Sequence, residues 1–245
     1  MTTLPLSGKT ALVTGGARRI GRAIALALAD AGADVALTYL RSATEASATL
    51  AQLTASGVRA MAVECDVRSE KSVRDAIGAT IAVFERIDVL VNNAAIFTQA
   101  PLESLSLEDW DNTFRTNTRG AFLMSREALP HLKAAEGCIV NIGSLGGMKA
   151  WATHAHYSSS KAALHALTQS MAKAFAPRVT VNCVAPGYID FDDDASAAAE
   201  RFAHRTPMQR NGSAEDVALA VLFFATGPRF ITGQILAVDG GLGLV

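Results

Sequence analysis

A serine, a tyrosine and a lysine stand at spacings that could deliver a proton to a substrate oxygen. Tyr157 and Lys161 are four positions apart, so on a helix both side chains project from one face. A free tyrosine has a pKa of about 10, but a nearby ammonium favours the phenolate and lowers that pKa toward neutrality. Ser144 lies upstream, where its hydroxyl could hydrogen-bond the same oxygen. The pattern predicts a general acid with a charged neighbour and a polarising hydroxyl.

The elements that must position these side chains are a strand, a loop and a helix. The apolar residues 138–140 predict a buried strand with a polar end at 141–144, followed by a loop rich in small residues. A helix is expected to open at Tyr157 and to carry Lys161 one turn later. A tyrosine and a lysine at this spacing alone would also suit an ordinary helix start with a surface lysine. Their combination with Ser144 favours catalysis.

A glycine-rich turn near the start of the chain has the form of an anion site. Residues 9–14 predict a strand, 15–21 a glycine turn, and the alanine-rich segment after it a helix to Ala31. This order places helix N–H groups where a pyrophosphate could sit. The turn alone would serve equally well as a structural element.

These motifs together resemble the short-chain dehydrogenase/reductase family over essentially the whole chain. The motifs are T-G-x-x-x-G-x-G at 14–21 with Arg19 in place of the middle glycine, N-N-A at 92–94, Asn117, Ser144, Tyr157, Lys161, P-G at 186–187 and D-G-G at 239–241. The resemblance implies hydride transfer from NADPH to a carbonyl or imine carbon. Tyr157 would supply the proton, Ser144 would polarise the acceptor, and Lys161 would tune Tyr157 and hold the nicotinamide ribose.

The resemblance also implies a set of contacts to the cofactor. The implied residues are Gly15, Arg18, Arg19, Ile20, Gly21, Arg41, Ser42, Asp66, Val67, Asn92, Ala94, Tyr157, Lys161, Pro186, Gly187 and Ile189. Asp66 would contact the adenine, although it could instead cap the helix expected near Ser69. Asp190 stands where the family commonly has a threonine that holds the cofactor amide or phosphates.

The expected cofactor is NADPH rather than NADH. A carboxylate at the end of the strand at 34–39 would bind a ribose 2′-hydroxyl, but the chain has Arg41 and Ser42 after that strand. In the resembling fold, Arg18 lies nearby. Either arginine alone could be a solvated surface residue. Two guanidinium groups without the acid favour a 2′-phosphate.

Asn117 is expected within a long helix that begins near Ser106 and that Pro130 bends or ends. An asparagine in the middle of a helix is intrinsically unfavourable, which suggests that Asn117 has a specific role. The resemblance implies that Asn117 steadies the active-site helix and passes protons through a water to Lys161.

The substrate side is less constrained by the sequence. Phe97, His156 and Tyr188 are expected to contact the substrate, under a lid near 188–210. Within that lid, the acidic run at 192–194 suggests the start of a helix. His154 and His156 could chelate a metal, but no third ligand is evident, so no metal is expected.

Three hypotheses about activity remain open at this stage. Arg19 and Phe97 resemble pteridine reductases, so the small carbonyl or imine substrate could be a dihydropteridine, although those enzymes usually carry an aspartate where Ser144 stands. The alternative is a 3-oxoacyl-carrier-protein reductase or a general ketone reductase. A protein of another class would be a non-catalytic NADPH-binding sensor or scaffold, against which the four filled catalytic positions argue.

Length and composition set the remaining expectations. The 245 residues suit a single domain at 1–245, and seven strands alternating with helices predict a Rossmann-type, doubly wound parallel sheet. A formal net charge of −1 argues against nucleic acid and a charged membrane surface. No apolar run reaches membrane-spanning length, the start lacks a signal peptide, and the three cysteines suit a reducing cytoplasm. Family analogy implies a homotetramer.

Overall fold

The computed structural model describes residues 4–191 and 197–245. Within them, seven parallel strands form one sheet in the order β3-β2-β1-β4-β5-β6-β7. The strands are β1 (Thr10–Val13), β2 (Asp34–Tyr39), β3 (Ala60–Glu64), β4 (Val89–Asn92), β5 (Cys138–Ile142), β6 (Thr180–Pro186) and β7 (Ile235–Val238). The strand order reverses between β1 and β4, which opens a crevice at the carboxyl ends of the strands. The predicted fold class is confirmed.

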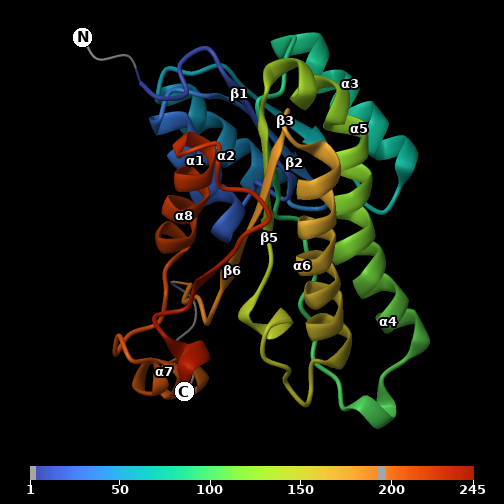
Figure 1. Cartoon of the computed structure of the whole chain (residues 1–245), viewed down its shortest axis with the longest axis vertical. Helices are drawn as coiled ribbons and strands as arrows, with labels where there is room; N and C mark the ends of the chain where they lie inside the picture. The colour runs from blue at the N-terminus through green and yellow to red at the C-terminus, as the bar shows by residue number, and fades with distance from the viewer. Residues whose placement is uncertain (1–3, 192–196) are drawn as a thin grey trace.

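Helices cover both faces of the sheet (Figure 1). On one face lie α1 (Arg19–Asp30), α2 (Ala43–Ala55) and α8 (Ala214–Thr226). On the other lie α3 (Glu70–Phe84), α4 (Leu107–Phe114), α5 (Gly120–Ala135) and α6 (Ala155–Phe175). The short α7 (Ala197–Arg205) lies near the carboxyl end of the chain, away from the main helical layers. No helix in the described part of the chain is long and apolar enough to cross a membrane.

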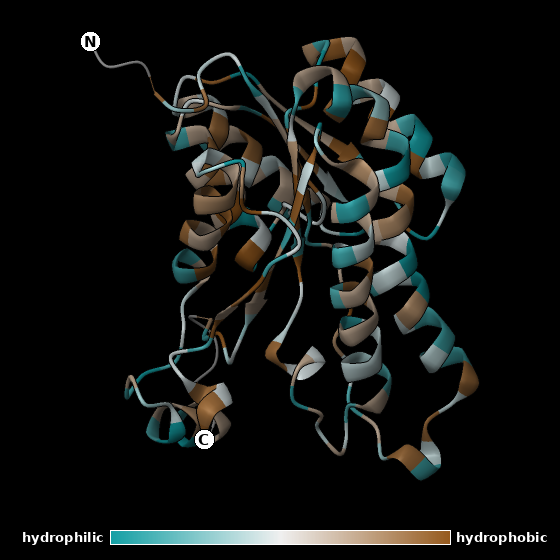
Figure 2. Cartoon of the chain, in the orientation of Figure 1, coloured by the Kyte–Doolittle hydropathy of each residue, from teal (hydrophilic) through white to brown (hydrophobic). Residues whose placement is uncertain are grey.

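The core has two halves because successive residues of a strand point to opposite faces of the sheet. Val13 packs with Ile24 and Leu28 of α1, whereas its neighbour Leu12 packs into the cluster that contains Met124 of α5. Both halves are apolar, so the central strands read as continuous hydrophobic runs. In Figure 2 the brown strands lie between helices that carry teal on their outer sides.

The active-site elements differ slightly from the sequence prediction. The strand predicted at 138–140 continues to Ile142, since its partner strands extend as far. The helix begins at Ala155 rather than Tyr157, because Ser158 N already donates to the His154 carbonyl oxygen at 2.8 Å. Tyr157 therefore lies within the first turn of α6.

The long helix expected near Ser106 is interrupted by a π-helical turn rather than by Pro130. Ser106 does cap α4, and its Oγ accepts from Asp109 N at 3.0 Å. The π turn (Arg115–Arg119) separates α4 from α5, and Pro130 lies inside α5 without ending it. π turns often occur at functional positions, and this one contains Asn117.

Candidate active site

Ser144, Tyr157 and Lys161 line one cavity of about 690 Å³. Ser144 follows β5 and begins a short 3₁₀ turn, where its Oγ accepts a hydrogen bond from Gly146 N at 3.0 Å. Tyr157 and Lys161 enter the cavity from α6. The strand end and the helix start therefore deliver the three groups to one place, as their spacing predicts.

Tyr157 is more strongly affected by burial than the sequence suggests. Burial raises the pKa of its phenol, and an interaction with the Ser144 hydroxyl acts in the opposite direction. The sequence prediction that the pKa of Tyr157 is lowered toward neutrality is wrong for this structure. The physical reason is that desolvation disfavours the phenolate more than its neighbours favour it.

Lys161 is buried and points its ammonium at the main chain. Its Nζ donates to the Ile142 carbonyl oxygen at 2.7 Å and lies 5.8 Å from the centre of the Tyr157 ring. Burial lowers the pKa of Lys161 to about 8. The amine is therefore still mostly protonated at neutral pH, but it loses its charge earlier than an exposed lysine.

The buried amide of Asn117 joins two parts of the site. Its Oδ1 accepts from Ile96 N at 2.9 Å, and its Nδ2 donates to the Ile96 carbonyl oxygen at 3.0 Å and to Ser160 Oγ at 3.1 Å. These bonds tie the segment after β4 to α6 and account for an asparagine within a helix. The proton-relay role implied by the resemblance stays a prediction.

Aromatic side chains wall the cavity beside Tyr157. The Phe97 ring meets the Tyr157 ring edge-on with 4.8 Å between centroids, and His154 stacks on Phe97 at 4.8 Å. Tyr188 stacks on Phe202 of α7 at 4.6 Å. All of them line the cavity, as does Trp151. Phe97 and Tyr188 line the cavity, and their contact with a substrate stays a prediction. Phe202 and Trp151 were not predicted from the sequence.

His156 does not lie where the sequence analysis expects it. His156 is fully buried and lines neither of the two cavities described in this section. Its Nε2 is hydrogen-bonded to Thr98 Oγ1 at 2.7 Å. His154 lines the substrate cavity instead. The reason is helical phase: His156 is already inside α6 and points inward, whereas His154 precedes the helix. No cluster of three or more histidine, cysteine or acidic side chains that could hold a metal occurs within residues 4–191 and 197–245.

A second cavity of about 460 Å³ adjoins the first. The residues that line both are Arg19, Ile20, Asn93, Ala95 and Phe191. Most predicted cofactor residues line the second cavity, namely Gly15, Arg18, Arg19, Ile20, Gly21, Arg41, Ser42, Asp66, Val67 and Ala94. Tyr157, Lys161, Pro186, Gly187 and Ile189 line the first. An extended molecule could therefore occupy both cavities at once.

The glycine turn packs closely against the start of α1. Gly15 adopts a φ of 63°, and a Cβ on Gly21 would lie 2.2 Å from the Gly15 carbonyl oxygen. The N-terminus of α1 has no side-chain cap and no acidic residue in its first turn. Its free N–H groups and positive dipole end therefore suit the pyrophosphate of a dinucleotide.

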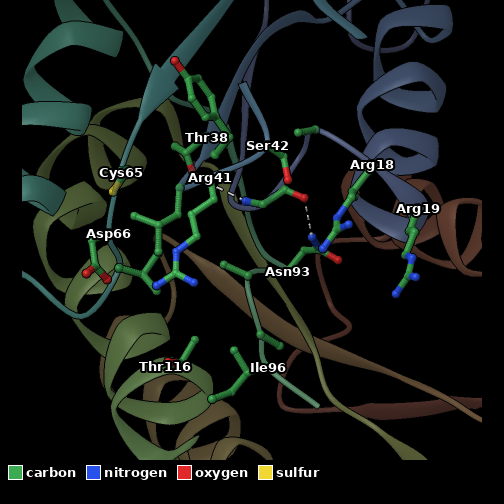
Figure 3. A pocket seen from close by; sticks show the side chains of 18 of the residues that line it. Arg18, Arg19, Thr38, Arg41, Ser42, Cys65, Asp66, Asn93, Ile96 and Thr116 are labelled. Atoms are coloured by element: carbon green, nitrogen blue, oxygen red, sulfur yellow. Dashed lines mark hydrogen bonds between the residues drawn. The ribbon is translucent and has the colours of Figure 1, made fainter. Parts of the chain in front are cut away.

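Arg18 and Arg41 extend into this second cavity from the glycine turn and from the loop after β2 (Figure 3). Neither side chain forms a hydrogen bond or ion pair in the described part of the chain. Asp66 is already engaged, since Arg68 NH2 lies 2.8 Å from its Oδ2. The Arg68 hydrogen bonds lower the pKa of Asp66, with a smaller contribution from Arg41. Both guanidinium groups line the cavity without a hydrogen bond to another described residue, so both could bind a phosphate there.

The alternative role considered for Asp66, capping the next helix, is wrong. Ser69 is the N-cap of α3, and its Oγ accepts from Ser72 N at 3.3 Å. Asp66 remains at the cavity, where its carboxylate faces Arg68.

Arg19 takes the middle glycine position of the motif and keeps a left-handed backbone, with φ at 50°. Such a conformation is uncommon for a residue with a side chain. Its guanidinium lies 4.9 Å from the centre of the Phe191 ring, at the junction of the two cavities.

One further sequence expectation, for Asn92, needs correction. Asn92 lines neither cavity, because its Nδ2 is turned into the core and donates to Asn141 Oδ1 at 2.8 Å and to Ser125 Oγ at 3.0 Å. Asn93 lines both cavities instead. Asp190 also lines neither, and its N–H donates to Gly212. The acidic run at 192–194 lies outside the described residues.

Comparisons with known proteins agree with this geometry. A family model described as enoyl-(acyl carrier protein) reductase matches residues 15–243. A 3-oxoacyl-(acyl-carrier-protein) reductase of Synechocystis is 42% identical over 241 residues, covering 97% of this chain and 98% of the relative. The corresponding enzyme of Aquifex aeolicus is 39% identical, covering 98% and 99%. A short-chain dehydrogenase from Burkholderia cenocepacia, solved with NADP, superposes with a TM-score of 0.92 at 43% identity, covering 97% and 99%.

Proposed function

The chain belongs to the short-chain dehydrogenase/reductase family, and we propose that it reduces the 3-oxo group of acyl thioesters with NADPH. The observation that carries the proposal is the junction of the two cavities. Ser144, Tyr157 and Lys161 line one of them, and Arg18 and Arg41 line the other. A cofactor whose phosphates lie at the arginines would extend toward the catalytic hydroxyls.

The proton chemistry follows from the chain's own residues. NADPH, when bound, supplies the hydride to the carbonyl carbon. The Tyr157 phenol, whose pKa burial raises, is protonated at neutral pH and donates its proton to the carbonyl oxygen. Ser144 hydrogen-bonds the same oxygen, and the protonated Lys161 stabilises the phenolate that remains on Tyr157.

The relatives favour an acyl thioester over a dihydropterin. The Synechocystis and Aquifex proteins are both 3-oxoacyl reductases and align along nearly their whole length. The aromatic wall of Phe97, Trp151 and Phe202 suits an apolar acyl chain as well as a flat ring. Ser144 supports the thioester further, because it lacks the carboxyl that the pterin hypothesis would use.

A substrate comparison that follows NADPH absorbance tests the proposal. We expect acetoacetyl thioesters to be reduced, and butyryl thioesters, which lack the 3-oxo group, to be inert. Dihydrobiopterin and a panel of simple ketones serve as competing substrates. Reduction of dihydrobiopterin with no reduction of acetoacetyl thioesters would overturn the proposal. Binding of NADPH without turnover of any substrate would instead favour a sensor or scaffold.

A further inference from the structure

The charged side chains that line the substrate cavity are all positive, although the formal net charge of the chain is close to zero. No aspartate or glutamate occurs among the described residues that line it. Its cationic side chains are Arg19, Lys149, Lys161 and Arg205. A cavity lined in this way favours a substrate that carries negative charge.

Three of these four cations already have a partner. Arg19 lies over the Phe191 ring. Lys161 donates to the Ile142 carbonyl oxygen, and Lys149 donates to the carbonyl oxygen of Val245.

Arg205 differs from them. Its side chain forms no hydrogen bond, ion pair or ring contact in the described part of the chain.

Arg205 stands at the opening of the cavity. It is the last residue of α7, and its side chain is both exposed to solvent and part of the cavity lining. Phe202 lies one turn earlier on the same helix and stacks on Tyr188 inside the cavity. A cation in the last turn is favourable for the helix dipole, but that effect does not require the side chain to line the cavity.

We propose that Arg205 binds the phosphate of the phosphopantetheine arm that carries the acyl chain. The inference rests on the proposed reduction of 3-oxo thioesters. The reacting carbonyl lies at Tyr157 and Ser144, so the rest of a thioester must leave through the cavity opening. The arm is uncharged until its phosphate, and a guanidinium fork matches phosphate oxygens in shape and charge. Arg205 thereby separates phosphorylated carriers from simple thioesters.

The experiment compares acetoacetyl-pantetheine with acetoacetyl-4′-phosphopantetheine, which differ only in the phosphate. The measured quantity is the ratio of kcat/KM for the phosphorylated over the unphosphorylated substrate. We expect Arg205→Ala to lower this ratio by about three- to tenfold, the range for an arginine–phosphate contact at an exposed rim. Arg205→Lys should retain part of it, because the charge remains. The matched control is Arg201→Ala, an exposed arginine of the same helix that does not line the cavity itself but lies 5.7 Å from the centre of the Phe202 ring.

Both kcat/KM values in the ratio are measured on the same variant. A general loss of folded enzyme or of turnover therefore lowers both values equally and leaves the ratio unchanged. An Arg205→Ala ratio equal to that of the wild type would overturn the role of Arg205 while leaving the proposed function intact. An equal fall in Arg201→Ala would do the same, since it would reduce the effect to general surface charge. Failure of the wild type to reduce either thioester would overturn the proposed function and this inference together. Acetoacetyl-coenzyme A and an acetoacetyl carrier protein then distinguish the source of the phosphate.

Discussion

The Lys161 ammonium lies 5.8 Å from the centre of the Tyr157 ring and is hydrogen-bonded to the Ile142 carbonyl oxygen rather than to the phenol. The two side chains therefore interact through space, across a buried region. In such a region a charge acts strongly on a neighbouring group because water screens it poorly. The lysine contributes most when negative charge develops on the phenol oxygen, as it does when Tyr157 gives up its proton.

Removing the phenol hydroxyl should abolish most turnover. Tyr157→Phe keeps the ring that contacts Phe97 but cannot donate a proton, so we expect kcat to fall by about 100-fold or more. NADPH binding, measured by fluorescence titration, should change little, since the phosphate contacts are elsewhere. A variant that keeps most of the wild-type rate would show that another group is the acid.

The charge on Lys161 should limit activity at alkaline pH. Its pKa of about 8 means that the ammonium is lost as the pH rises through that value. We expect kcat/KM for NADPH, which reports groups of the free enzyme, to fall above about pH 8. Lys161→Arg should move this limb to higher pH because a guanidinium stays protonated. Lys161→Ala should lose both turnover and NADPH affinity. A wild-type profile that is flat between about pH 7 and about pH 10 would contradict the assignment.

Local spacing explains what could be predicted from the sequence. Tyr157 and Lys161 share a helix face by geometry alone, and Ser144 is placed by the strand that precedes it. The glycine turn is similarly local, because strand, turn and helix are consecutive in the chain. The alternation of strands and helices then specifies the parallel sheet.

Side-chain direction could not be predicted where a shift of one or two residues along the chain, or a contact between distant segments, determines it. Asn92 and Asn93 are neighbours, yet one is turned into the core and the other toward the cavities. His154 and His156 are exchanged for the same reason at the start of α6. Phe202 lines the cavity from α7, which is far from the other site residues in the sequence, so no local pattern predicts its position. The expected homotetramer, cytoplasmic location and lid stay predictions.

The two free arginines should determine the choice of cofactor. Arg41→Ala removes one guanidinium from the cavity, so we expect the preference for NADPH over NADH in kcat/KM to shrink by about tenfold. Arg18→Ala should act in the same direction. The matched control is Arg22→Ala, because Arg22 is bonded to Gln52 at the surface and does not line the cavity. Equal efficiency with both cofactors in the wild type would refute this account, as would an Arg41→Ala enzyme with an unaltered preference.

The buried His156 should act on the substrate through the loop that carries Phe97. His156 Nε2 lies 2.7 Å from Thr98 Oγ1, and Ala100 N donates to the Thr153 carbonyl oxygen at 3.0 Å, so two hydrogen bonds fasten this loop to the region of α6. Thr98→Val keeps the shape but removes the hydroxyl, which leaves a buried imidazole nitrogen without its partner.

We expect Thr98→Val to lower the free energy of unfolding by about 1–3 kcal/mol, the usual cost of an unsatisfied buried polar group. Because Phe97 would be held less firmly beside Tyr157, KM for the acyl substrate should rise more than kcat falls. Thr98→Ser restores the hydroxyl and should recover most of both quantities. Chemical denaturation and initial rates at varied thioester concentration measure the two effects. If Thr98→Val matched the wild type in KM while losing stability, the bond would support folding alone and would not position the substrate wall.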